Sequence, residues 1–252
     1  VRNGIHWIVA SLCLMALAGC PAVGPDYVRP EVESPQNWQA EMKNSLQAVI
    51  GAVLLFTAIG CGTINRPIHI ADGSQVSRSL TSVNGSITIG SSCEIDGTCQ
   101  TVNGSIKIGD DTSVDGKVAS VNGSIRVGQR VIVDGSLKAV NGSVSTGREC
   151  RIDGSVATVN GCITLVETTV NQKLVTYNGR IILKRGSEVL GDIIIKDTDG
   201  NSRRKPLTIK IGGKSIVHGD IINENDDLEV NVYVLEGARV DGELIKCTRI
   251  DS

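Results

Sequence analysis

The sequence predicts an all-β, single-stranded parallel β-solenoid (β-helix) with coils of about 19 residues, placed after an N-terminal signal and lipobox region. A Val-Asn-Gly-Ser-Ile phrase that begins at Val83 occurs six times, at steps of 19, 19, 19, 19 and 18 residues, and its last copy, Tyr177–Ile181, is degraded. Apolar and polar residues alternate within each copy, and aromatic residues make up only 2% of the chain. A fixed period of this length is typical of stacked repeats, and a Val- and Ile-filled interior suits thin layers.

Each repeat is expected to contain two strands joined by glycine turns. Val83, Gly85 and Ile87 share one parity, and a second phrase, Ile95-Asp96-Gly97, follows about twelve residues after the first. Period 2 is the signature of a strand with its apolar set facing inward. The connections are too short for crossover helices, so a parallel solenoid is favoured over a barrel or sandwich. A meander of hairpins is the alternative, because Asn-Gly and Asp-Gly also form two-residue hairpin turns.

Alignment by 19 residues assigns positions to columns and predicts seven or eight coils. One interior column contains Ile87, Ile106, Ile125, Val144 and Ile163, and another contains Ile89, Ile108, Val127, Thr146 and Leu165. Cys93, Cys99 and Cys150 fall in register with small apolar or Thr positions and are expected to be core residues. Cys93 and Cys150 lie three coils apart, roughly 14 Å at the spacing of paired strands, which is too far for a disulfide. Cys162 replaces an outward Ser and is expected to be exposed.

The first 61 residues contain two export signals. Each has a basic start and a short apolar run, and they end in Leu17–Cys20 and Ala58–Cys61. Both endings resemble the bacterial lipobox, which implies that the cysteine is lipidated: Cys61, or alternatively Cys20. Pro21 and Gly62 follow these cysteines, and the absence of Asp there implies, by the same resemblance, an outer-membrane lipoprotein facing the periplasm or the surface.

The segment Val23–Glu31, followed by Pro35 and Trp38, resembles the mature N-terminus of outer-membrane efflux lipoproteins. The resemblance covers only residues 1–40, and the long heptads of that family do not follow. We therefore expect residues 1–41 to be a remnant that carries the first lipobox, and the functional product to begin at Met42. Membership of an efflux system stays an alternative that rests on this segment alone.

The rest of the chain divides into a second signal peptide (residues 42–61), a linker and N-terminal cap (62–80), solenoid repeats (81–196), and irregular coils with a C-terminal cap (197–252). Within the last part, Leu207–Ile211 reads as a strand. Val234–Leu244 and His218–Ile221 resemble coils of bactofilin-like, polymer-forming β-helix proteins. The Val-Asn-Gly repeats are similar to the β-solenoids of putative adhesins, and together the likeness covers residues 80–246.

Two polar columns are candidate sites. Stacked Asn amides are expected to form a hydrogen-bonded structural ladder that braces a turn; they are Asn84, Asn103, Asn122, Asn141, Asn160 and Asn178. The Asp column consists of Asp96, Asp115, Asp134 and Asp153. Like charges ~4.8 Å apart repel by about 1 kcal/mol, which a hard cation would relieve, but the repeat lacks the pattern of calcium-binding β-rolls. We interpret this column as a solvated turn and predict no metal and no cofactor.

Other chemistry finds little support. A formal net charge of −2 gives no electrostatic case for nucleic acid. The eight cysteines contain no C-x-x-C pair, and His6, His69 and His218 are not spaced for a catalytic set. The basic stretch Arg203–Lys205 reads as a solvated hairpin tip, with lipid headgroups or anionic polysaccharide as alternative partners.

The sequence therefore predicts a non-enzymatic, lipid-anchored protein of the cell envelope, a structural or adhesin-like β-solenoid scaffold. The alternatives are a self-polymerising bactofilin-like scaffold and a glycan- or cation-binding module. The expected partners are a membrane, reached through the N-terminal lipid, further copies of the chain, and envelope polysaccharide.

Overall fold

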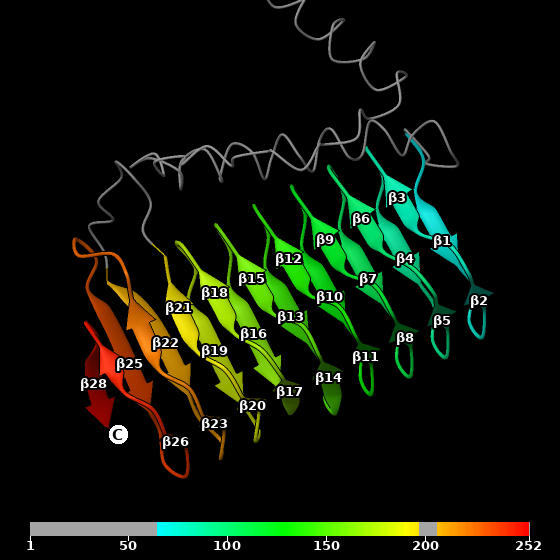
Figure 1. Cartoon of the computed structure of the whole chain (residues 1–252). Coiled ribbons are helices and arrows are strands. Elements are labelled where there is room, and N and C mark those ends of the chain that lie inside the picture. Colours follow the sequence, from blue (N-terminus) through cyan, green and yellow to red (C-terminus); the bar gives the residue numbers. More distant parts are fainter. Residues whose placement is uncertain (1–64, 197–205, 252) are drawn as a thin grey trace, which may run out of the picture. The chain divides into compact units, whose positions relative to one another are not determined.

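The structure is a computed structural model that describes residues 65–196 and 206–251. These residues form 28 β-strands and no helix, and the strands stack into three parallel sheets (Figure 1). One strand of each sheet belongs to each coil, so the chain visits the three sheets in turn. Nine complete coils are present, and one further strand follows them. The predicted parallel β-solenoid is confirmed.

The first sheet has ten strands and carries the Ser-Ile end of the repeated phrase. Its strands are β1 (Ile68–Ile70), β4 (Ile87–Ile89), β7 (Ile106–Ile108), β10 (Ile125–Val127), β13 (Val144–Thr146), β16 (Ile163–Val166), β19 (Ile181–Lys184), β22 (Leu207–Ile211), β25 (Val230–Val234) and β28 (Thr248–Asp251). At ~4.8 Å per strand the ten strands span roughly 45 Å.

The other two sheets have nine strands each. The second contains β2 (Gln75–Val76), β5 (Glu94–Ile95), β8 (Ser113–Val114), β11 (Ile132–Val133), β14 (Cys150–Ile152), β17 (Thr168–Val170), β20 (Glu188–Val189), β23 (Ile216–Val217) and β26 (Arg239–Val240). The third contains β3 (Leu80–Ser82), β6 (Cys99–Thr101), β9 (Val118–Ser120), β12 (Leu137–Ala139), β15 (Val156–Thr158), β18 (Leu174–Thr176), β21 (Ile193–Ile195), β24 (Ile221–Asn223) and β27 (Leu244–Ile245).

Strand pairing excludes the hairpin alternative, because the paired strands are parallel and one coil apart. Ile87 of β4 pairs with Ile106 of β7, and Ile106 pairs with Ile125 of β10. The prediction of two strands per coil was wrong. The Asp-Gly phrase is a corner that divides the expected second strand into two, as Asp96 and Gly97 do between β5 and β6.

Glycine is required where successive coils approach most closely. A Cβ added to Gly123 would lie 2.0 Å from the carbonyl oxygen of Gly104 in the preceding coil. At the Asp-Gly corner, a Cβ on Gly116 would lie 2.5 Å from the carbonyl oxygen of Gly97. Neither position can accept a side chain without moving backbone, which explains why the phrases repeat their glycines.

The core lies between the three sheets and consists of continuous apolar columns. The column that contains Ile87 and Ile125 is fully buried through Ile163, and the column of Ile89 is nearly so. As expected, Cys93, Cys99 and Cys150 point into this core, with 3%, 0% and 3% of their surface exposed. Each layer buries its apolar face against the layers above and below, as the repeat period predicted.

The Val of the repeated phrase does not enter the main core, contrary to expectation. Val121, Val140 and Val159 form a separate cluster at a corner, with Val102 and Tyr177 packed against it. The parity of the chain changes at this turn, because the residue before each Val points inward. Those inward residues are mostly hydroxyl side chains: Ser82, Thr101, Ser120, Thr158 and Thr176 are 0–1% exposed.

The buried hydroxyls satisfy glycine carbonyls of the preceding coil. Thr101 Oγ1 donates to Gly85 O at 2.8 Å, Ser120 Oγ to Gly104 O at 2.8 Å, and Thr158 Oγ1 to Gly142 O at 2.9 Å. Ala139 interrupts this column. A second hydrogen-bonded column thus braces the same turn that the Asn residues occupy.

Regular coils extend further in both directions than expected. β1, β2 and β3 form a complete coil inside residues 68–82, where a linker and cap were predicted, and Ile68 pairs with Ile87 in register. Beyond the insertion, β22 resumes the first sheet at Leu207–Ile211, as predicted, and Ile209 pairs with Ile181. The tract expected to hold irregular coils therefore continues the stack to β28.

Candidate functional site

The Asn column forms an uninterrupted ladder of amides. Each side chain donates from Nδ2 to Oδ1 of the Asn one coil earlier, over distances of 2.7–3.0 Å. The ladder begins at Asn65, which accepts from Asn84 at 2.7 Å, and reaches Asn178. A continuous row of amides therefore lies on the surface along one corner of the stack.

The Asp column lies at another corner, where Asp96, Asp115 and Asp134 are exposed. Asp153 accepts from Arg151 at 2.5 Å and from Asn171 at 2.6 Å. Within the described ranges, no group of three or more His, Cys, Asp or Glu side chains is arranged to hold a metal ion. The arrangement is that of a solvated turn with local partners.

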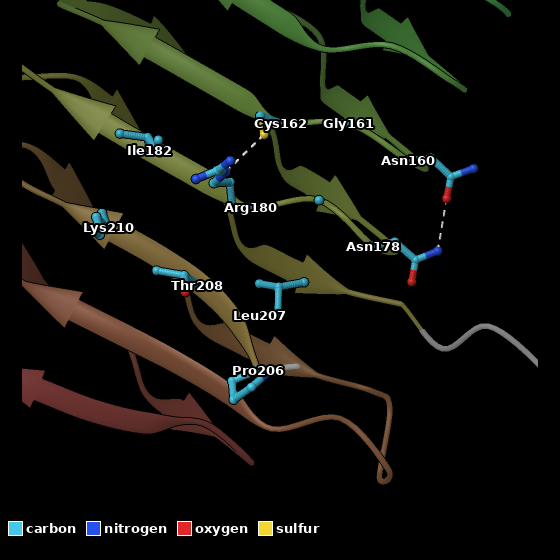
Figure 2. A pocket seen from close by; sticks show the side chains of 11 residues that line it. Asn160, Gly161, Cys162, Asn178, Arg180, Ile182, Pro206, Leu207, Thr208 and Lys210 are labelled. Atoms are coloured by element: carbon cyan, nitrogen blue, oxygen red, sulfur yellow. Dashed lines mark hydrogen bonds between the residues drawn. The ribbon is translucent and has the colours of Figure 1, made fainter. Parts of the chain in front are cut away.

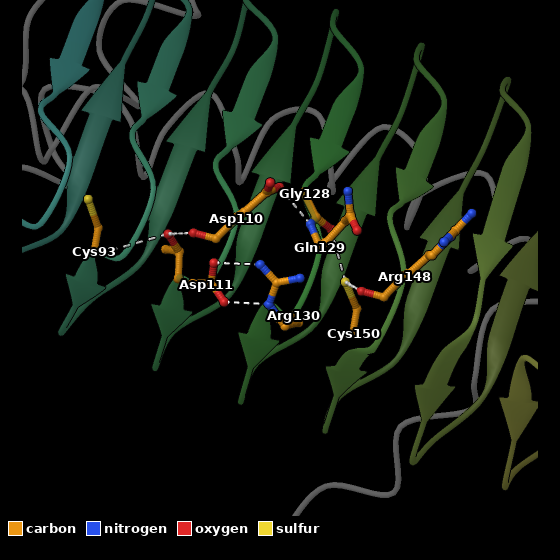
Figure 3. A network of polar contacts seen from close by, with 9 residues as sticks. Cys93, Asp110, Asp111, Gly128, Gln129, Arg130, Arg148 and Cys150 are labelled. Atoms are coloured by element: carbon orange, nitrogen blue, oxygen red, sulfur yellow. Dashed lines mark hydrogen bonds and ion pairs between the residues drawn. The ribbon is translucent and has the colours of Figure 1, made fainter.

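The turn between the first and second sheets holds non-glycine residues in the left-handed conformation. Asp111 has φ 56° and Arg130 has φ 54°, and their side chains form a two-pronged ion pair at 2.6 and 2.8 Å (Figure 3). The Arg130 guanidinium lowers the pKa of the Asp111 carboxyl, first through these hydrogen bonds and then through its charge. The pair joins two coils at a strained turn, which is a structural role.

Two core thiols lie close to the same turn and act as hydrogen-bond donors. Cys93 Sγ lies 3.1 Å from Ala71 O, and Cys150 Sγ lies 3.0 Å from Gly128 O, while Thr112 occupies the same column with its hydroxyl 3.1 Å from Gly90 O (Figure 3). Burial raises the pKa of the Cys150 thiol and raises that of Cys99 to about 12. These thiols are neutral structural groups, because the reactive form is the thiolate.

A cleft of about 650 Å³ opens on the first sheet, near the end of the Asn ladder. Residues from three successive coils line it, and Figure 2 shows their side chains. They are Asn160, Gly161, Cys162, Asn178, Gly179, Arg180, Ile182, Pro206, Leu207, Thr208 and Lys210. The cleft lies at the first coil after the regular 19-residue period ends.

The register of the strands places two cations in this cleft. Ile181 pairs with Ile209 and Ile182 with Lys210, so Arg180 and Lys210 extend from neighbouring strands on the outer face of the sheet. Arg180 Nε donates to Cys162 Sγ at 3.2 Å (Figure 2), and Lys210 Nζ lies 5.7 Å from the centroid of the Tyr233 ring. Cys162 is half-buried rather than fully exposed.

Sequence reasoning did not find this cleft as a site. Its signal was the degraded phrase Tyr177–Ile181, in which Arg180 replaces the Ser of the other copies. Lys210 follows an insertion whose length breaks the period, so its place beside Arg180 depends on the strand register. Only the substitution of Ser by Cys at position 162 stood out from the columns.

The histidines are far apart in the fold. His69 is exposed on β1, and His218 Nε2 lies 2.7 Å from Glu188 Oε1, with Nδ1 2.9 Å from Asp241 Oδ2. These three residues belong to successive coils and hold the C-terminal coils together.

Several predicted sites lie outside the described residues. They are the lipidation sites Cys20 and Cys61, both export signals with His6, and the basic stretch Arg203–Lys205. Within residues 65–196 and 206–251, no helix is both long enough and apolar enough to cross a membrane.

Comparisons with protein-family models, with curated proteins and with solved structures found no match to this chain.

Proposed function

We propose that this protein is a non-enzymatic scaffold of the bacterial cell envelope, lipid-anchored at its N-terminal region and either structural or adhesin-like in role. The observation that carries the proposal is the continuity of the stack through nine coils. Such a stack presents the same side chains at a fixed spacing along each face, which suits a spacer or a repetitive binding surface.

Three features support a rigid body. Parallel pairing joins every coil to the next in all three sheets, the Asn ladder fixes one corner, and buried hydroxyls fix the backbone beneath it. Because each layer contacts only its neighbours, stiffness along the stack depends on these repeated links. A rigid stack held by a flexible lipidated segment would keep its faces at a set distance from the membrane.

The anchor part of the proposal rests on the lipobox-like endings at Cys20 and Cys61, and radioactive palmitate tests it. The full chain is expressed in a Gram-negative host, beside the variants Cys61→Ser and Cys20→Ser. We expect label and membrane association in the parent chain, loss of both in Cys61→Ser, and retention in Cys20→Ser. Mass spectrometry of the mature N-terminus then identifies the lipidated residue. Absence of label from the parent chain would overturn the anchor.

Self-polymerisation is the second candidate, favoured by the strand edges at the two ends of the stack. Among the described residues no further strand pairs beyond β1 or beyond β28. Ile68, Ile70 and Val76 at one end, and Val240 and Leu244 at the other, are only partly buried. Unpaired edges of this kind are templates for further pairing.

Electron microscopy of the full chain tests this candidate. We expect filaments that disappear when a proline is inserted into β28, because proline removes a donor from the edge. An alanine inserted at the same position is the matched control. Dispersed single particles at all concentrations would exclude polymerisation and leave the scaffold role standing.

A further inference from the structure

The cleft on the first sheet carries a positive charge that no acidic neighbour balances. Arg180 and Lys210 belong to its lining, which contains no Asp or Glu. Neither side chain forms an ion pair with a carboxylate of the described residues: Arg180 donates to the Cys162 sulfur, and Lys210 lies over the Tyr233 ring. Both cations therefore have donors free for an anion.

The break in the repeat creates this arrangement. In the regular coils, the position of Arg180 holds a Ser whose hydroxyl accepts from the next backbone amide, as Ser143 Oγ accepts from Cys162 N at 3.1 Å. Lys210 lies opposite Ile182, one pleat further along the strand than Arg180. Side chains placed diagonally on neighbouring strands are about 7–8 Å apart at the backbone, so two long cations there can bind one anionic group.

The remaining lining suits a sugar ring rather than a bare ion. Asn160 uses one N–H to reach Asn141 and one lone pair to accept from Asn178, so its amide retains a second donor and a second lone pair. Thr208 adds a hydroxyl, and Ile182 provides an apolar contact beside the cations. Paired donors and acceptors next to apolar surface match the hydroxyls and C–H faces of a saccharide, and the cleft volume lies within the ordinary range for ligand pockets.

We propose that this cleft binds an anionic saccharide through a uronate-type carboxylate held by Arg180 and Lys210. The amide of Asn160 and the hydroxyl of Thr208 orient the hydroxyls of the sugar. The site goes beyond the scaffold role and does not depend on it, because a rigid spacer needs no such cleft. Failure of the binding test would leave the anchor and scaffold experiments unaffected.

Calorimetry with the full chain tests the proposal at low ionic strength, where exposed charges are least screened. The probes are digalacturonate, its neutral counterpart digalactose, and inorganic phosphate. We expect digalacturonate to bind and digalactose not to bind. Arg180→Gln and Lys210→Gln should each weaken binding about tenfold, since each removes a charge-assisted contact.

Arg126→Gln is the matched control. Arg126 is an exposed cation of β10 in the same outward column as Lys210, but it lies outside the cleft. Its removal should change the affinity by about twofold or less. A loss equal to that of the cleft variants would mean that general surface charge binds the probe, which overturns the site.

Cys162 supplies a second readout inside the cleft. The tryptic peptide of residues 152–173 contains Cys162 and no other cysteine, so its alkylation by a maleimide can be followed by mass spectrometry. Digalacturonate should slow this alkylation in the parent chain but not in Arg180→Gln/Lys210→Gln. Absence of both binding and protection overturns the proposal, and phosphate binding as tight as digalacturonate overturns its saccharide part.

Discussion

Replacing Ala139 by Ser should stabilise the solenoid by about 1 kcal/mol. Ala139 is 3% exposed and lies in the inward column where Ser120 and Thr158 donate to glycine carbonyls of the preceding coil, at 2.8 and 2.9 Å. The equivalent acceptor for residue 139 is the carbonyl of Gly123. An added hydroxyl supplies the donor that the column lacks there, and a buried hydrogen bond contributes about 1 kcal/mol net.

Thermal unfolding measures this effect. For a domain of this size, about 1 kcal/mol raises the Tm by roughly 2–4 °C. Ala157→Ser is the matched control, because Ala157 lies in the middle of β15 on the outward side, where a hydroxyl meets no glycine carbonyl. Its effect should stay within about 0.5 kcal/mol. If Ala139→Ser lowers the Tm, or changes it no more than the control, the hydroxyl column does not stabilise the stack as argued.

Three further predictions concern stability. Gly123→Ala should cost more than about 4 kcal/mol in urea unfolding, because its Cβ would lie 2.0 Å from the Gly104 carbonyl oxygen. Asn122→Ala should cost about 1 kcal/mol by the same assay, because it removes two exposed amide hydrogen bonds of 2.8 and 2.9 Å. Burial raises the pKa of Cys99 from 9.0 to about 12, so the stability it contributes is complete below pH 9.0 and is lost as pH rises toward 12, by about 1.4 kcal/mol per pH unit. Cys99→Val should remove that share of the alkaline loss, measured by urea unfolding at neutral and alkaline pH.

Controls separate these effects from general destabilisation. Gly186→Ala adds a Cβ with no atom within 4 Å at φ +73°, and should cost only about 1 kcal/mol. Val118→Ala in the Cys99 column should lower stability equally at both pH values, because it adds no titrating group. A milder effect of Gly123→Ala than of Gly186→Ala would contradict the close approach of the coils. An unchanged alkaline loss in Cys99→Val would contradict the burial of the thiol.

The alternation of residues predicted the interior columns correctly but misplaced the corners. Ile87 and Ile89 point inward as expected, because period 2 holds within a strand. Val83 was expected to share that side, but a turn separates it from Ile87 and resets the parity. Alternation also continued through Asp96 and Gly97, where the chain turns, so two strands were expected where three are present. Strands of two or three residues are too short for their ends to be recognised from the pattern.

The Asn ladder and the cleft show the same contrast at the candidate sites. A 19-residue step stacks identical side chains at a strand spacing, so contacts between successive Asn amides could be expected from the sequence. Arg180 and Lys210 are 30 positions apart across an insertion, and no periodic rule gives their register. Their proximity follows from the pairing of Ile182 with Lys210.

The sequence by itself determined the stacked architecture, because a strict period with alternating Val and Ile can bury its apolar face only against its own neighbours. It also determined which residues share a column. Tertiary structure decided the number of sheets, the position of the Val cluster and the location of the cleft. These depend on where the chain turns and on how the stack resumes after an interruption, which is fixed by backbone contacts between coils that are distant in sequence.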